Sequence, residues 1–183
     1  TPNASGVRVG GNTGVGGGGT GTLTVSGAGS RVNMLGGIAH LWIGTDPTGG
    51  TTPSAGTVTI ASGGQIILDP AAGGGIGNSP GSSGTLTVTG ADSLPDTGAF
   101  LGVGKNSAGG PGGTGTLTVS AGGTVKAAEI QVGPGGTVNG SGGTIIGSVV
   151  NLGGTVNPGQ SAGRLSIIGN YESVGGKLVV EVD

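Results

Sequence analysis

The sequence predicts an all-β chain in which short parallel strands stack as a single β-solenoid without a significant helix. The first observation behind this prediction is a repeated phrase, G-T-[L/V]-T-[V/I], found at residues 21–25, 56–60, 84–88 and 115–119. The second is that the connections between the repeats are glycine-rich and unequal in length. The third is that one Phe, one Trp and one Tyr are too few for an aromatic-filled sandwich core.

Within this phrase, polar and apolar residues alternate with a period of two, which is typical of a strand with one buried face. The residues expected to point inward are Leu23, Val25, Val58, Ile60, Leu86, Val88, Leu117 and Val119. The residues expected to point outward are Thr22, Thr24, Thr57, Thr59, Thr85, Thr87, Thr116 and Thr118.

Each copy of the threonine phrase lies in a longer unit that contains an aliphatic residue followed by glycine. These pairs are Val9-Gly10, Ile43-Gly44, Ile76-Gly77 and Val103-Gly104. Residues 38–43 (I-A-H-L-W-I) are the most apolar segment and open the second unit, whose loop is residues 45–54. Residues 65–68 are expected to form a further short strand, and residues 92–97 a polar loop.

After Val119 the spacing tightens. The predicted single domain (1–183) therefore has longer coils with glycine-rich loops in residues 1–120 and tighter coils in residues 121–183. A phrase of the form G-G-[T/K]-[V/I/L] occurs at residues 122–125, 135–138, 142–145, 153–156 and 175–178, and a degraded threonine phrase, G-R-L-S-I, at 163–167. Residues 125–130 are the one helix candidate, and a single turn flanked by glycines is too short to be stable.

Two segments resemble a known group of proteins. Residues 103–125 (V-G-K-N-S-A-G-G-P-G-G-T-G-T-L-T-V-S-A-G-G-T-V) resemble the repeat of bacterial type V autotransporter passengers. Residues 157–171 (N-P-G-Q-S-A-G-R-L-S-I-I-G-N-Y) and 175–182 (G-G-K-L-V-V-E-V) resemble the passenger-associated repeat nearer the C-terminus of such proteins. The resemblance implies a right-handed parallel β-helix displayed outside a Gram-negative cell.

Composition excludes several classes of function. Of 183 residues only 8% are charged, the net charge is −2 and there is no cysteine, so nucleic-acid binding and thiolate metal sites are not expected. No apolar run approaches the roughly 20 residues that span a bilayer, so this segment should make no membrane contact. The formal G-x-G-x-x-G match at residues 14–19 precedes no helix, so we expect no phosphate site and no cofactor.

The acidic residues offer one close pair before the C-terminus, Asp92 and Asp96. Two carboxylates can do acid–base work on a glycosidic bond, which keeps a carbohydrate-binding or polysaccharide-degrading β-helix as an alternative. A solvated loop is the simpler interpretation, and we expect no enzyme and no catalytic residues. His40 has no second His with which to bind a metal. For His40 we favour a structural role near an end of the solenoid. We expect Trp42 either to cover such an end or to stack on a sugar ring.

The outward threonines would form two parallel ladders, with about 4.8 Å between rungs and about 6.6 Å along a strand. Such T-x-T arrays resemble the ice-binding faces of some β-solenoid antifreeze proteins, which gives a second alternative. Threonine also has high strand propensity, so the ladders have a purely structural explanation.

The function that the sequence favours is an extracellular structural module of a bacterial surface protein: an adhesin stalk, a surface layer or a self-assembling filament. Neither residues 1–6 nor 177–183 provide a charged or helical cap. The open strand edges are therefore expected to stack end to end with a second copy or to continue into a longer solenoid. A surface glycan is a candidate ligand.

Overall fold

The computed structural model describes residues 6–11, 18–37, 39–45, 52–106, 110–159 and 163–181. Within them the chain is all β, as predicted, with no helix and hence no helix long and apolar enough to cross a membrane. Several predicted features lie wholly or partly outside these residues, namely Ile38, the glycine match 14–19, the loop 45–54 and the segments 1–6 and 177–183.

The described strands form two sheets, and every pairing between the strands is parallel. The seven-stranded sheet consists of β2 (Thr20–Ser26), β5 (Ala55–Ala61), β8 (Ser83–Thr89), β11 (Thr114–Ser120), β13 (Gly136–Ser141), β15 (Thr155–Asn157) and β18 (Lys177–Leu178). The eleven-stranded sheet consists of β1 (Gly6–Val9), β4 (His40–Ile43), β7 (Gly73–Ile76), β10 (Phe100–Val103), β12 (Thr124–Val132), β9 (Leu94–Asp96), β6 (Gln65–Leu68), β3 (Arg31–Met34), β14 (Gly143–Asn151), β16 (Leu165–Ile168) and β17 (Tyr171–Ser173).

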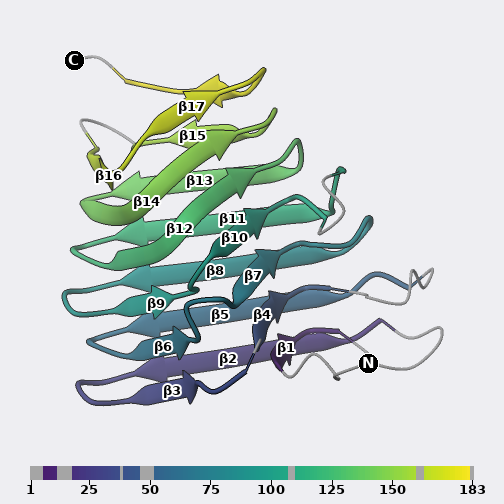
Figure 1. Cartoon of the computed structure of the whole chain (residues 1–183). Helices are drawn as coiled ribbons and strands as arrows, with labels where there is room; N and C mark the ends of the chain where they lie inside the picture. The colour runs from purple at the N-terminus through teal and green to yellow at the C-terminus, as the bar shows by residue number, and fades with distance from the viewer. Residues whose placement is uncertain are drawn as a thin grey trace.

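The eleven-stranded sheet is made of two rows of strands that share β12 and β14. The strands β1, β4, β7 and β10 form one row, and β3, β6 and β9 form the other. β12 joins them, because it pairs with both β10 and β9, and beyond β14 the rows separate again into β16 and β17. In chain order, the strands visit the first row, the seven-stranded sheet and the second row in turn, and they stack from purple to yellow in Figure 1.

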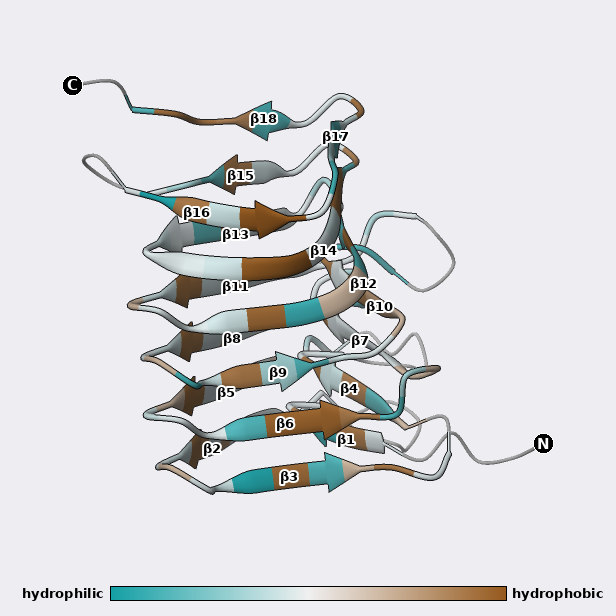
Figure 2. Cartoon of the chain, turned by 60° about the vertical axis from the view of Figure 1, so that its left-hand side comes forward, coloured by the Kyte–Doolittle hydropathy of each residue, from teal (hydrophilic) through white to brown (hydrophobic). Residues whose placement is uncertain are grey.

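The core lies between the sheets and is built from the alternate residues of each strand. Hydrophobic residues alternate with polar ones within the strands, as the brown and pale bands of Figure 2 show. Val58, Ile60, Leu86, Val88, Leu117 and Val119 are fully buried, and Val25 is nearly so. Leu23 is only partly buried, because β2 is the first strand of its sheet. Each buried aliphatic side chain contributes roughly 1.5–3 kcal/mol.

A glycine–glycine contact closes the base of each loop that leads into the threonine phrase. Gly77 and Gly104 follow β7 and β10 with a φ of 61° each, a conformation that favours glycine. The first glycine of the next threonine phrase lies directly against them. A Cβ on Gly84 would be 2.4 Å from the Gly77 amide nitrogen, and one on Gly115 would be 2.3 Å from that of Gly104. The aliphatic–glycine pair and the threonine phrase therefore both require glycine, because a side chain on either glycine would overlap the backbone of the other segment.

The prediction of a polar loop at residues 92–97 is wrong, because it contains the strand β9. Pro95 is buried in this strand, between β6 and β12. β9 pairs with β6 along its length but with β12 only between Asp96 and Lys126. Proline has no N–H to donate, which is consistent with this short pairing.

The prediction that residues 163–167 repeat the threonine phrase is also wrong. Leu165–Ile168 forms β16, which pairs with β14 in the eleven-stranded sheet. The sequence G-G-[T/K]-[V/I/L] likewise precedes strands of both sheets: β12 and β14 in one, and β13, β15 and β18 in the other. The copies of this phrase after Val119 are closely spaced in part because strands of both sheets carry it, so that it occurs more than once in each repeat.

The repeats themselves also become shorter in the second half. Thr85 pairs with Thr116, but Thr116 pairs with Thr137 and Thr137 with Thr155. The connection between the first row and the seven-stranded sheet shrinks to a tight turn there, in which the Gly136 amide donates to the Gly133 carbonyl at 2.7 Å.

We expect Gly84→Ala to lower the free energy of unfolding by at least about 2 kcal/mol, because its Cβ would overlap backbone atoms that cannot move separately. Gly37→Ala is the matched control: nothing lies within 4 Å of its Cβ position, so the change should stay within about 0.5 kcal/mol. Denaturant unfolding followed by circular dichroism measures both. Equal stabilities of the two variants would contradict the role of the glycine contact.

Candidate functional site

The outer side of the seven-stranded sheet carries two columns of threonines, which we call the threonine face. Strand register aligns the columns as Thr22–Thr57–Thr85–Thr116 and Thr24–Thr59–Thr87–Thr118. The first column continues through Thr137 and Thr155, and the second through Asn139 and Asn157. Thr22, Thr24 and Thr57 are exposed and the rest are half-buried.

The threonine face offers hydroxyl groups that the protein does not use. Within the described part of the chain, none of the eight hydroxyls predicted to form the ladders has a hydrogen-bond partner. At the margin of the face, by contrast, the Ser120 hydroxyl donates to Thr89 Oγ1 at 3.1 Å. The threonine hydroxyls are therefore available to water or to a ligand.

Toward the C-terminal end, the threonine face is hollowed by a groove of about 470 Å³. Thr118, Asn139, Gly140, Ser141, Asn157 and Gly159 line it. Gly140 lies opposite Val119, at an inward position, and the Leu165 side chain occupies the space that a Cβ on Gly140 would need. The column of threonine hydroxyls thus continues as the amide side chains of Asn139 and Asn157, next to the position where Leu165 replaces an inward side chain at Gly140.

The two acidic residues of the predicted pair have different surroundings. Asp92 is exposed in the turn after β8 with a φ of 63°, which short polar residues tolerate. Gln65 donates to its backbone carbonyl at 3.5 Å. Asp96 is the last residue of β9, and its side chain is only 18% exposed.

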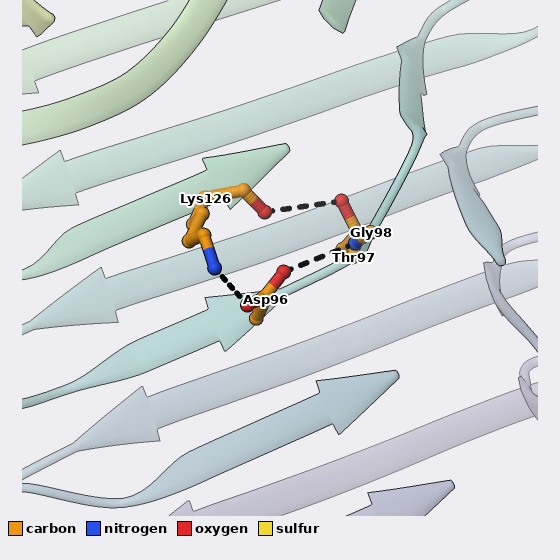
Figure 3. Close-up of polar contacts among 4 residues, drawn as sticks. All are labelled: Asp96, Thr97, Gly98 and Lys126. Carbon is orange, nitrogen blue, oxygen red and sulfur yellow. Dashed lines mark hydrogen bonds and ion pairs between the residues drawn. The ribbon is translucent and has the colours of Figure 1, made fainter. Parts of the chain in front are cut away.

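The Asp96 carboxylate joins β9 to β12, as Figure 3 shows. Lys126 Nζ lies 2.7 Å from Asp96 Oδ2, and the Gly98 amide donates to Oδ1 at 3.1 Å. The amide of the buried Thr97 donates to the Lys126 carbonyl at 2.9 Å. Both oxygens of Asp96 are engaged, so this carboxylate fixes the corner after β9.

These corners shorten over four successive repeats and then lengthen again. They comprise residues 69–72 between β6 and β7, 97–99 between β9 and β10, 127–128 within β12 and residue 147 within β14, followed by residues 169–170 between β16 and β17. A groove of about 430 Å³ lies along the four corners from 69–72 to 147, with Asp96 and Lys126 on its wall and the exposed Ile146 and Ile168 at one end. Its lining is mainly apolar.

His40 and Trp42 lie on the outer side of the eleven-stranded sheet. They alternate with the buried residues Leu41 and Ile43, and both are half-buried. β4 pairs with β1 on one side and with β7 on the other, so Trp42 does not cover an end of the stack. The sequence analysis identified residues 38–43 only as an apolar segment, and nothing local in the sequence indicated what lies beside His40 and Trp42.

No group of three or more His, Cys, Asp or Glu side chains in the described ranges could hold a metal ion. Comparisons of the chain with protein-family models, with curated proteins and with solved structures gave no match. A functional assignment therefore depends on the surfaces of this molecule.

We expect Asp96→Ala to cost about 1–2 kcal/mol of stability, because it removes the ion pair and leaves the Gly98 amide without its acceptor. Asp92→Ala, at an exposed position, should change stability by no more than about 0.5 kcal/mol. Chemical denaturation measures the difference. Polysaccharide cleavage that is abolished by both Asp92→Asn and Asp96→Asn would instead show that the pair is catalytic.

Proposed function

We propose that the chain is a right-handed parallel β-helix that serves as a structural module of a bacterial surface protein. The order in which the strands visit the three rows supports a helical path, and parallel crossovers are right-handed in about 98% of cases. The resemblance of residues 103–125 and 157–171 to autotransporter passengers supports a location outside a Gram-negative cell. The module acts as an adhesin stalk, as part of a surface layer or as a filament.

The observation that carries this proposal is the apolar strand edge at the C-terminal end of the stack. Among the described strands, β18 pairs only with β15. Leu178 and Val180 are 50% and 61% exposed. An edge with free backbone groups and apolar side chains templates a further parallel strand. That strand belongs to the same polypeptide in a longer helix or to a second copy stacked end to end.

The role is structural and not catalytic. Both Asp96 oxygens already bind protein groups, and Asp92 lies in an exposed turn. Screening the chain against pectin, alginate and neutral glycans should therefore give no turnover.

Analytical ultracentrifugation across a concentration series tests the strand edge. We expect the unaltered chain to associate and the double variant Leu178→Glu/Val180→Glu to stay monomeric, because charges on an edge oppose strand addition. Ile146→Glu, which adds a charge on the side of the stack, is the control and should associate like the parent. Electron microscopy should then show fibres with a regular axial repeat.

Two results would count against parts of the proposal. Association that persists in the double variant would contradict the role of the C-terminal edge. A parent chain that is monomeric at every concentration would exclude self-assembly and leave the stalk in a longer polypeptide.

We propose ice binding as a second candidate function, because the threonine face has the required regularity. Its two columns keep their register through β2, β5, β8 and β11, with hydroxyls that have no described protein partner. Parallel pairing spaces the hydroxyls at about 4.8 Å in each column. A regular array of this kind can order water molecules into a lattice.

Freezing-point hysteresis tests this second candidate. We expect Thr118→Tyr to abolish hysteresis, because a bulky ring interrupts the array. Thr144→Tyr should leave it intact, since Thr144 lies on the outer side of the other sheet, opposite Thr124 and Ser166. Absence of hysteresis in the parent chain would rule ice binding out.

A further inference from the structure

The single Trp, the single Phe and the single His of the chain lie on the same outer face. His40 and Phe100 are both opposite Gly73, on the two sides of β7, and Trp42 is opposite Gly75. With strands about 4.8 Å apart, the backbones of His40 and Phe100 are separated by about 10 Å. Residues that are 60 positions apart in sequence are thus brought to one surface, which we call the aromatic face.

Glycines form the floor of the aromatic face. A Cβ on Gly75 would lie 2.7 Å from Trp42 Cζ3, so the indole occupies the space above that glycine. A Cβ on Gly102 would lie 3.2 Å from Phe100 Cε1, so the phenyl ring occupies the space above Gly102. β7 adds no outward side chain at Gly73 or Gly75, and both glycines are buried beneath the neighbouring residues.

The aromatic rings also contact one another and nearby charged groups. The His40 and Trp42 ring centroids are 5.2 Å apart, with planes tilted by 36°. Lys105 Nζ lies 5.7 Å from the Phe100 centroid, within cation–π range. These contacts hold the rings in place, while His40, Trp42 and Phe100 are half-buried and keep part of their surface accessible.

Polar side chains of both charge signs flank the rings. Arg8 lies opposite Trp42, and Glu129 lies opposite Phe100. Gln131, opposite Gly102, donates a hydrogen bond to Glu129. A ligand of either net charge would meet a like charge on this face, whereas a neutral polar ligand would find both donors and acceptors.

We propose that the aromatic face binds a neutral, linear oligosaccharide that runs across the strands from β4 to β10. Sugar rings present C–H surfaces that stack on aromatic faces and hydroxyls that bond to flanking polar groups, which is the combination found here. The span of about 10 Å between His40 and Phe100 matches about two linked sugars and exceeds a single one. Single-stranded nucleic acid also stacks on aromatic rings, but it needs a basic groove that a chain with net charge −2 does not provide.

Intrinsic fluorescence tests this proposal directly, because Trp42 is the only tryptophan. The probes are cellohexaose, xylohexaose and mannohexaose, with hexagalacturonate and oligo(dT) as charged comparisons. We expect at least one neutral hexasaccharide to change the emission saturably, with little response to glucose. Phe100→Ala, which keeps the Trp42 reporter, should weaken this binding by about tenfold or more.

Two further variants complete the experiment, with circular dichroism to verify that each is folded. Gly75→Ala should displace the indole and weaken binding too, whereas Thr118→Ala, on the threonine face, should bind like the parent. Calorimetric titration provides a readout independent of fluorescence. The proposal is overturned if no neutral hexasaccharide binds, if only hexagalacturonate or oligo(dT) binds, or if Phe100→Ala and Gly75→Ala bind like the parent.

Discussion

The architecture depends on the contact between two glycines at the base of each long loop. Gly77 and Gly84 bring two backbone segments closer than any side chain permits, and Gly104 with Gly115 repeats the arrangement. The amide of Gly77 also donates to the Ile43 carbonyl of the preceding repeat at 2.8 Å. Each contact therefore fixes the loop and the register together. Loops of different length and composition can be inserted without disturbing the strands, since loop-closure entropy grows only slowly with length.

The sequence predicts the strands best where an alternating pattern and its flanking glycines coincide. Residues 115–120 illustrate this, because period, punctuation and repetition agree. β9 was missed because the polar segment 92–97 with its central Pro95 lacks the alternating pattern of a strand. The missing N–H of Pro95 is tolerated, because β12 pairs with β9 only at Asp96. The position of Leu165 was missed because G-R-L-S-I resembles a strand of one sheet and lies in the other. Short phrases identify strands here but not the sheet to which they belong.

The surfaces follow the same logic. Threonine columns were predictable because each repeat carries the same local signal at the same position. The surroundings of Trp42 were not, because they are set by the register with Gly75, which lies in the next repeat. Asp96 and Lys126 are likewise 30 residues apart in sequence and 2.7 Å apart in space. Local patterns thus predict which face a residue occupies, while its neighbours across the strands depend on loop lengths that carry no such pattern.

The C-terminal repeats combine specific polar anchoring with exposed apolar surface. Asn151 occupies the inward position of Val103 and Val132, and its amide accepts from the Gly154 amide at 2.9 Å and donates to the Lys177 carbonyl at 3.1 Å. These bonds hold β18 in position, since a buried amide with satisfied partners tolerates little displacement. Because each repeat is buried only by its neighbours, covering Leu178 or Val180 would contribute roughly 1.5–3 kcal/mol per side chain if burial were complete. A rigidly placed strand with such a gain still available is suited to receive another strand.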